Sequence, residues 1–141
     1  DTQEQISWVI ADAMNLPFAP QVFDGAICGY LLRNVSGVDV ALSEHIRVLK
    51  KGGRMLSLDT TPPQDNWLKP FVTFYLRVVI PRLGSWFAGD PDAYTYLPQS
   101  TEHFLSAEKL AERMHGAGFK SVGWVRRLMG TMAIHWGDKV E

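Results

Sequence analysis

The sequence predicts an α/β fold, a sheet layered with helices, and three observations carry this prediction. Apolar residues recur at helical spacing over residues 38–49, which indicates a helix with one buried face. Lys50–Lys51 and Gly52–Gly53 follow, and we expect the lysines in the last helical turn and the first glycine in the left-handed turn that ends it. Met55–Leu58 then has the composition of a buried strand, completing half of a βαβ unit.

The same helix carries two polar features. Ser36 or Asp39 is expected to cap its start, because the two residues have the spacing of a capping box. His45 lies on the buried stripe and is most simply a core histidine with its hydrogen bonds satisfied.

Length and charge narrow the class of protein. The 141 residues are enough for one domain with a sizeable core. The 14 Lys and Arg against 15 Asp and Glu give a formal net charge of −1, which favours neither a nucleic-acid nor an anionic-membrane partner. Cys28 is the one cysteine, so an internal disulfide is excluded, and its apolar neighbours suggest a buried thiol in a reducing compartment. No metal-ligand spacing and no apolar run of membrane length occur, so we expect a soluble, cytoplasmic protein without a metal site.

Two strands are expected before the helix, and each ends in polar residues. Ile6–Ile10 leads into Asp12, which is placed where ligands bind in doubly wound folds but is equally suited to capping the next turn. Phe23–Tyr30 leads into Arg33 and Asn34. Such a pair in a loop usually faces solvent, and its position at a strand end favours a site instead.

An apolar and aromatic segment follows the central strand. Over residues 70–81 the sequence predicts a helix with apolar side chains on most of its sides. Burial in the core is the default interpretation of such a helix, and a lid over an apolar substrate is the functional alternative.

The last part of the chain predicts a helix and an antiparallel edge pair. Ser106 is suited to cap the helix, and Gly116 and Gly118 are suited to stop it. Phe119–Arg126 and Thr131–Trp136 have the composition of two strands joined by a turn.

Short motifs along the chain resemble one protein family in the family's own order. They are Asp12-Ala13 with Asn15–Phe18, Phe23-Asp24, Leu32–Val35, Arg47–Lys50 with Gly52-Gly53, Asp92–Tyr94 with Tyr96-Leu97, Ala117–Phe119 and Ala133–Gly137. On these motifs the chain resembles the C-terminal two thirds of the C-methyltransferases of menaquinone and ubiquinone biosynthesis, which are class I S-adenosylmethionine-dependent methyltransferases. The resemblance implies a single incomplete domain over residues 1–141, whose Rossmann-like sheet of order 3-2-1-4-5-7-6 lacks its first two strands.

The resemblance also implies roles for individual residues. Asp12 and the backbone amides of Ala13 and Met14 would bind the adenine of S-adenosylmethionine. Arg33 and Asn34 would position water or the quinol hydroxyl, so that the ring carbon becomes nucleophilic. An arginine does not deprotonate in water, so any base role of Arg33 runs through a polarised water.

The substrate implied by the resemblance is an isoprenoid quinol. Tyr75, Tyr94 and Tyr96, in the aromatic helical lid segment 66–105, would cover the quinol and exclude water. Such a substrate implies peripheral contact with a membrane. His135 matches a family position in the last strand, and we interpret it as structural.

The chain also departs from the family pattern. Lys51, Asp59 and Thr61 stand where the family has proline, glutamate and serine. The glycine-rich loop and the ribose-binding acid, which precede the position of Asp12 in the family, are absent, which leaves only adenine contacts. Three interpretations stay open: a fragment or truncated product of a quinone-pathway C-methyltransferase whose parent is active, a non-catalytic dimerisation or scaffold module, and a binder of apolar small molecules.

The two missing strands have a structural consequence. Phe23–Tyr30 would expose an apolar edge, and such edges are seldom left free. We expect either that Ile6–Ile10 moves beside this strand or that a second copy of the chain covers it by pairing or swapping, which predicts a homodimer.

Overall fold

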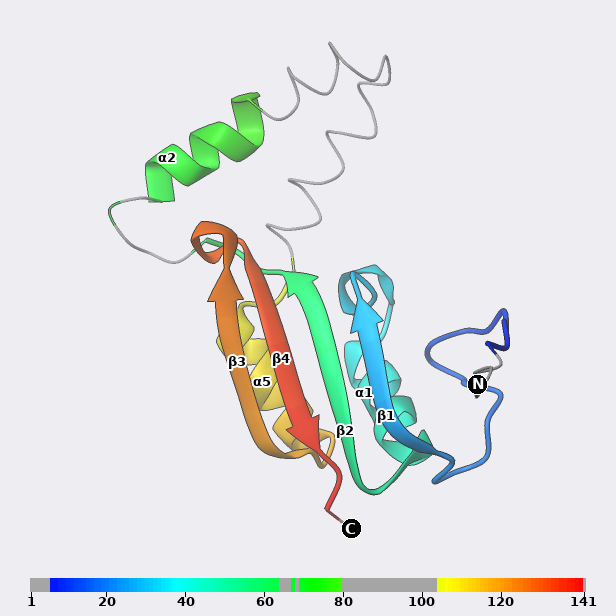
Figure 1. The fold of residues 1–141 in the computed structure, drawn as a ribbon. Coiled ribbons are helices and arrows are strands. Elements are labelled where there is room, and N and C mark those ends of the chain that lie inside the picture. The colour runs from blue at the N-terminus through cyan, green and yellow to red at the C-terminus, as the bar shows by residue number, and fades with distance from the viewer. Residues whose placement is uncertain (1–5, 64–66, 68, 80–103, 141) are drawn as a thin grey trace, which may run out of the picture.

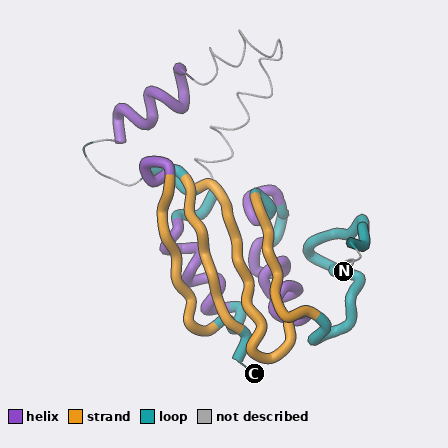
Figure 2. Tube along the Cα trace, in the orientation of Figure 1, coloured by secondary structure: helices purple, strands orange, loops and turns teal. Residues whose placement is uncertain are grey.

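The structure is a computed structural model that describes residues 6–63, 67, 69–79 and 104–140. These residues form one four-stranded sheet with helices packed on it (Figure 1). Its strands lie in the order β1-β2-β4-β3, with β1 parallel to β2 and β4 antiparallel to both β2 and β3 (Figure 2). They are β1 (Phe23–Gly29), β2 (Leu49–Thr60), β3 (Lys120–Arg127) and β4 (Met132–Asp138). This order reproduces the 4-5-7-6 part of the expected sheet, and the predicted antiparallel edge pair is confirmed.

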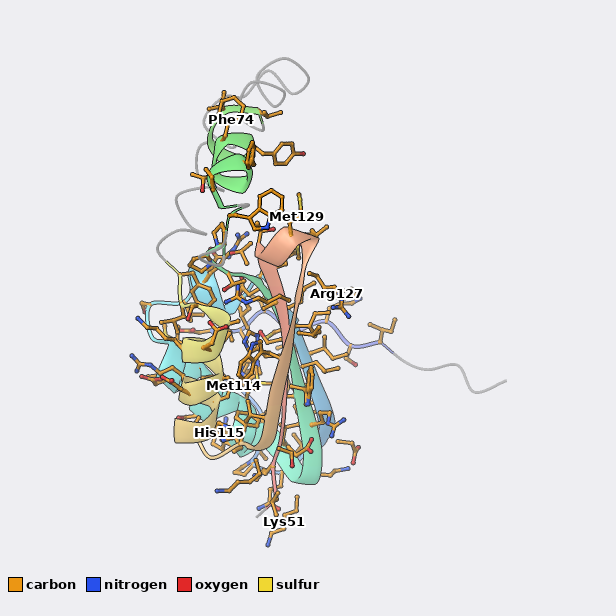
Figure 3. All side chains as sticks on the ribbon, turned by 90° about the vertical axis from the view of Figure 1, so that its left-hand side faces the viewer. Lys51, Phe74, Met114, His115, Arg127 and Met129 are labelled. Atoms are coloured by element: carbon orange, nitrogen blue, oxygen red, sulfur yellow. The ribbon has the colours of Figure 1, made fainter. Side chains whose placement is uncertain are left out.

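The helices are distributed unevenly about the sheet. The two that cover it, α1 (Val38–Val48) and α5 (Ala107–Gly116), lie on the same face (Figures 1 and 3). A third helix, α2 (Lys69–Phe74), continues as the π-helical turn η2 (Tyr75–Val79) and stands beyond the carboxyl end of β2 (Figure 1). Two 3-10 turns complete the described elements, η1 (Leu32–Asn34) after β1 and η3 (Leu128–Gly130) between β3 and β4. No helix among these residues is long and apolar enough to cross a membrane.

The core fills the space between the two covering helices and the sheet. Leu42 of α1, Met55 of β2, Met114 of α5 and Phe119 are all 0% exposed. Burying a side chain of this size stabilises the fold by about 1.5–3 kcal/mol. Cys28 also belongs to this core, so the predicted buried thiol is confirmed.

Both predicted ends of the central helix are wrong. α1 stops at Val48, because the next residue, Leu49, already pairs with Phe23 in the parallel ladder. Lys50–Gly53 therefore belong to β2; Gly52 does adopt a left-handed conformation (φ 79°), but within an irregular part of the strand. Gly37 occupies the N-cap position and no side chain caps the helix.

The two predicted caps make other contacts. The Ser36 hydroxyl donates to Met14 Sδ at 3.4 Å, and the Asp39 carboxylate pairs with Arg113 of α5. By contrast, Ser106 caps α5 as predicted, since its Oγ accepts from the Lys109 amide. His45 is buried with Nδ1 2.7 Å from the Ala41 carbonyl oxygen, which confirms its assignment to the core.

The predicted strand Ile6–Ile10 is wrong. These residues form no strand and are exposed, because no strand among the described residues pairs with them. The segment that follows is bound to α1, where the Arg47 guanidinium donates to the carbonyls of Leu16 and Phe18. The proposed cover of β1 by Ile6–Ile10 is therefore wrong too, and β2 is the one neighbour of β1 among the described residues.

Candidate functional site

Polar side chains meet where β1 and β2 end. Arg33 lies in η1, directly after β1, and Asp59 and Thr60 end β2. The strands are parallel, so both ends lie at the carboxyl edge of the sheet, where α/β proteins bind ligands. Arg33 Nε lies 3.6 Å from Asp59 Oδ1, and Arg33 Nη1 donates to Thr60 Oγ1 at 3.3 Å. The backbone amide of Arg33 donates to Asp59 Oδ2 at 3.2 Å, so the two strand ends are joined by charge and by hydrogen bonds.

Both members of this ion pair are withdrawn from solvent. The side chain of Arg33 is 8% exposed and that of Asp59 is 1% exposed. Burial raises the pKa of the Asp59 carboxyl above its ordinary value, and the hydrogen bonds from the Thr60 and Arg33 amides and the nearby guanidinium oppose that rise only in part. Arg33 Nε is buried and has no hydrogen-bond partner among the described residues, so it suits an oxygen atom of a ligand or a water.

Tyr30 belongs to the same site and was not among the predicted residues. Its φ of 55° is left-handed, which is uncommon for a tyrosine and typical of strained positions near function. The Arg33 Cζ atom lies 5.0 Å from the centroid of the Tyr30 ring, within the range of a cation–π contact. A left-handed tyrosine has no signature in the sequence, and only its position between a strand and the Arg-Asn pair could have drawn attention to it.

Asn34, the residue that follows Arg33 in the predicted site, has different surroundings from Arg33. Its side chain is exposed, and Nδ2 donates to the Tyr30 carbonyl oxygen at 2.6 Å. Asn34 thus supports the strained backbone that presents Tyr30, whereas Arg33 is turned to the carboxylate of β2.

The predicted adenine-binding residues form a tight turn. The exposed Asp12 accepts at Oδ1 from the Met14 amide at 2.9 Å, and its carbonyl accepts from the Asn15 amide at 3.0 Å. The turn-capping interpretation of Asp12 is therefore confirmed, and the Met14 amide is directed at Asp12. Because Met14 Sδ contacts Ser36, just after η1, this turn lies at the same edge of the sheet as Arg33.

The predicted lid residues fall partly outside the described structure. Tyr75 lies in η2 and is 45% exposed, next to Phe74 (60%) and Phe71 (67%) on one side of the helix. Burial of these three residues in the core, the default expectation, is wrong. Tyr94 and Tyr96 lie outside the described residues.

His135 of β4 has a structural position, as expected. It is 1% exposed on the helix-covered face, and its Nε2 donates to the Ala107 carbonyl at the start of α5, at 2.9 Å. Because a carbonyl can only accept, the proton of the neutral ring lies on Nε2. Burial lowers the pKa of His135, which keeps the ring neutral. Among the described residues no cluster of His, Cys, Asp and Glu has the makeup of a metal site.

Comparison with known proteins identifies relatives along most of the chain. The family model described as the ubiE/COQ5 methyltransferase family matches residues 1–139. The ubiquinone/menaquinone biosynthesis C-methyltransferase UbiE of Desulfotalea psychrophila is 51% identical over 134 residues, which are 95% of this chain and 54% of that protein. The demethylmenaquinone methyltransferase of Lactiplantibacillus plantarum is 38% identical over 142 residues, 98% of this chain and 60% of that protein.

A solved structure shows the same fold. An S-adenosylmethionine-dependent methyltransferase from Thermotoga maritima superposes with a TM-score of 0.62 at 20% identity, covering 92% of this chain and 62% of that one. At this identity the likeness concerns the fold alone. The chain spans a little over half the length of the curated relatives that it matches.

Proposed function

This chain belongs to the ubiE/COQ5 methyltransferase family, and we propose that it forms the substrate-facing part of an S-adenosylmethionine-dependent C-methyltransferase that acts on a quinol ring. The observation that carries the proposal is the buried pair of Arg33 and Asp59 at the carboxyl edge of the sheet. The names of the relatives, which refer to ubiquinone and menaquinone, support the class of substrate.

The pair suits the chemistry of methylation at an aromatic carbon. Such a carbon is most nucleophilic when the phenolic oxygen of the ring carries negative charge. The Arg33 guanidinium would stabilise that charge through Nε, which has no hydrogen-bond partner among the described residues. Asp59 would hold the guanidinium in place, and Tyr30 would cover its other side. Arg33 does not act as a base itself, so the phenolic proton would leave through a polarised water.

The residues present fit one end of the cofactor. S-adenosylmethionine supplies, when bound, a methyl group activated on a sulfonium. The exposed carboxylate of Asp12 suits the adenine amino group, and we propose that the backbone amide of Ala13 also contacts the adenine. The Met14 amide already donates to Asp12. The sequence has no glycine-rich loop for the methionine and ribose portions, so we propose adenine contacts alone for this chain.

The aromatic segment would complete the site. We propose that Tyr75 of η2, together with Tyr94 and Tyr96, covers the isoprenoid quinol. The position of α2 beyond the carboxyl edge of the sheet supports this role (Figure 1). We place the protein in the cytoplasm, with peripheral contact to the membrane in which such a quinol dissolves.

A second candidate function is a dimerisation module, favoured by the bare edge of β1. We propose that a second copy of the chain pairs there, because Ile27 is 82% exposed and β1 has β2 as its one described neighbour. Light scattering should give the mass of a dimer, and Ile27→Lys should shift it toward the monomer. A monomeric wild-type chain would exclude this pairing.

The test of the methyltransferase proposal is calorimetric titration of the chain with S-adenosylmethionine and S-adenosylhomocysteine. We expect weak, saturable cofactor binding that Asp12→Ala abolishes, and binding of a quinol that Arg33→Lys weakens without changing cofactor binding. Absence of both kinds of binding would overturn the enzymatic proposal for this chain and favour the non-catalytic module.

A further inference from the structure

Tyr30 combines an unfavourable backbone conformation with an exposed ring at the carboxyl edge of the sheet. Its φ of 55° lies in the left-handed region, where the Cβ of a tyrosine crowds the following carbonyl oxygen. The residue is 41% exposed, so its ring contributes little to the core. Fold stability alone would favour glycine at this position, because glycine adopts such a backbone without strain.

Four contacts hold this strained residue in place. The Tyr30 amide donates to the Leu58 carbonyl at 2.8 Å, and the Tyr30 carbonyl accepts from Asn34 Nδ2 at 2.6 Å. The Arg33 guanidinium lies over the ring, and the hydroxyl donates to Met132 Sδ at 3.7 Å. A strained residue that its surroundings fix from several sides is typical of a ligand-binding site.

The contact with Met132 determines which hydrogen-bonding role Tyr30 offers to a ligand. A thioether sulfur can accept a hydrogen bond but cannot donate one. The proton of the Tyr30 hydroxyl is therefore directed at Met132 Sδ, which leaves the phenolic oxygen as an acceptor. Tyr30 thus suits a ligand group that donates a hydrogen bond, such as a hydroxyl.

Arg33 offers the complementary role beside it. Its Nε is a buried donor that has no hydrogen-bond partner among the described residues, and a charged donor suits a negatively charged oxygen. A quinol ring carries two oxygens, and deprotonation of one of them is enough to make a ring carbon nucleophilic. The two side chains therefore match the two oxygens, with Arg33 at the phenolate and Tyr30 at the oxygen that remains a hydroxyl.

We propose that Tyr30 is a specificity-determining residue, which accepts a hydrogen bond from the second hydroxyl of the quinol ring. This role deepens the proposed function and rests on it. It favours a ring with a free second hydroxyl over a ring whose second oxygen is oxidised or methylated, because neither of the latter has a hydrogen to donate there. One hydrogen bond of this kind corresponds to a preference of about three- to tenfold.

The test compares two small naphthols that differ only at the second oxygen, by calorimetric titration in the absence of air. One is 1,4-dihydroxynaphthalene, and the other is 4-methoxy-1-naphthol, in which a methyl ether replaces the second hydroxyl. We expect the wild-type chain to bind the dihydroxy compound about three- to tenfold more tightly. Tyr30→Phe keeps the ring and removes its oxygen, so it should bind the two compounds equally. A preference caused by the size of the methyl group would persist in this variant.

Met132→Leu tests the direction of the hydroxyl proton. Leucine is similar in volume to methionine but has no acceptor, so the Tyr30 hydroxyl becomes free to donate. We expect this variant to bind the methoxy compound more tightly than the wild-type chain does. Tyr30→Phe should leave binding of the methoxy compound unchanged.

Glycine substitutions at the two ends of β1 separate the contact from the strain. Gln21, before β1, also has a left-handed backbone (φ 59°), so Gln21→Gly is the matched control for Tyr30→Gly. Both variants relieve strain, and we expect urea unfolding to show neither of them less stable than the wild-type chain. Tyr30→Gly should nevertheless lose the preference for the dihydroxy compound, whereas Gln21→Gly should keep it.

The outcomes distinguish this role from the proposed function. The role of Tyr30 is overturned if the wild-type chain binds the two compounds equally, or if Tyr30→Phe or Tyr30→Gly keeps the wild-type preference. In each of these cases, binding that Arg33→Lys weakens would keep the proposed function. A chain that binds neither compound would overturn the proposed function and the role of Tyr30 together.

Discussion

Arg33 and Asp59 connect the carboxyl ends of two parallel strands, with Arg33 Nε 3.6 Å from Asp59 Oδ1 and both side chains almost fully buried. A buried pair of this kind contributes little net stability, because desolvation offsets the attraction of the charges, but removal of one partner leaves the other uncompensated. The pair is therefore better explained by the site that it forms than by the stability of the fold.

The pH dependence of stability should report on Asp59. Its pKa in the folded chain is raised, so its contribution is complete below the ordinary value of 3.8 and is lost as the pH rises through the folded value. We expect the unfolding free energy of the wild-type chain, relative to Asp59→Asn, to fall as the pH rises above the ordinary value of 3.8. Urea unfolding at each pH measures it, and a difference that grows with pH would contradict the prediction.

The contribution of Glu44 to stability should have the opposite pH dependence to that of Asp59. Hydrogen bonds from Arg47 lower the pKa of Glu44 to about 2, and Glu44 Oε2 also accepts from the Leu16 amide at 2.8 Å. Its contribution is present above the ordinary value of 4.5 and is lost as the pH falls toward about 2. Glu44→Gln should therefore speed hydrogen exchange of the Leu16 amide at neutral pH, with the exposed Glu112→Gln as a control. Unchanged exchange would show that the ion pair does not hold this loop.

His135 should matter for stability rather than for binding. His135→Phe would remove the side-chain hydrogen bond to the Ala107 carbonyl, at a cost of about 0.5–1.5 kcal/mol. Because burial lowers the pKa of His135, its contribution is complete above about 6.5 and is lost as the pH falls through the folded value. Thermal unfolding should thus show a variant that is less stable at neutral pH and less sensitive to acid. His115→Gln, at an exposed position, should change neither property.

Substitution of Gly123 should destabilise the fold because Trp136 packs against it. A Cβ at this position would lie 2.4 Å from Trp136 Cζ2, so the indole would have to move out of its place on the neighbouring strand. We expect Gly123→Ala to cost about 1–3 kcal/mol in urea unfolding. Gly29→Ala is the matched control in β1, where nothing lies within 4 Å of the added carbon, and it should cost less. Equal losses in the two variants would refute the packing argument.

Features of the fold that depend on residues close together in the sequence could be predicted from the sequence alone. The apolar stripe of α1, the cap at Ser106 and the pair formed by β3 and β4 could each be predicted, because burial periodicity and capping depend on neighbouring residues. The strand predicted over Ile6–Ile10 failed because apolar composition does not say whether a partner strand is present. The end of α1 failed because the ladder with β1, and not Gly52, decides where the helix stops.

The sequence by itself determined the family, the order of most elements and the position of Arg33 after a strand. Only the tertiary structure decided that Arg33 meets Asp59, that Tyr30 adopts a left-handed conformation beside it, and that α2 and η3 expose apolar side chains at the same end. The physical reason is that Arg33 and Asp59 are 26 residues apart. Their contact depends on the register of the parallel ladder, in which Cys28 lies opposite Ser57, and no local pattern encodes that register.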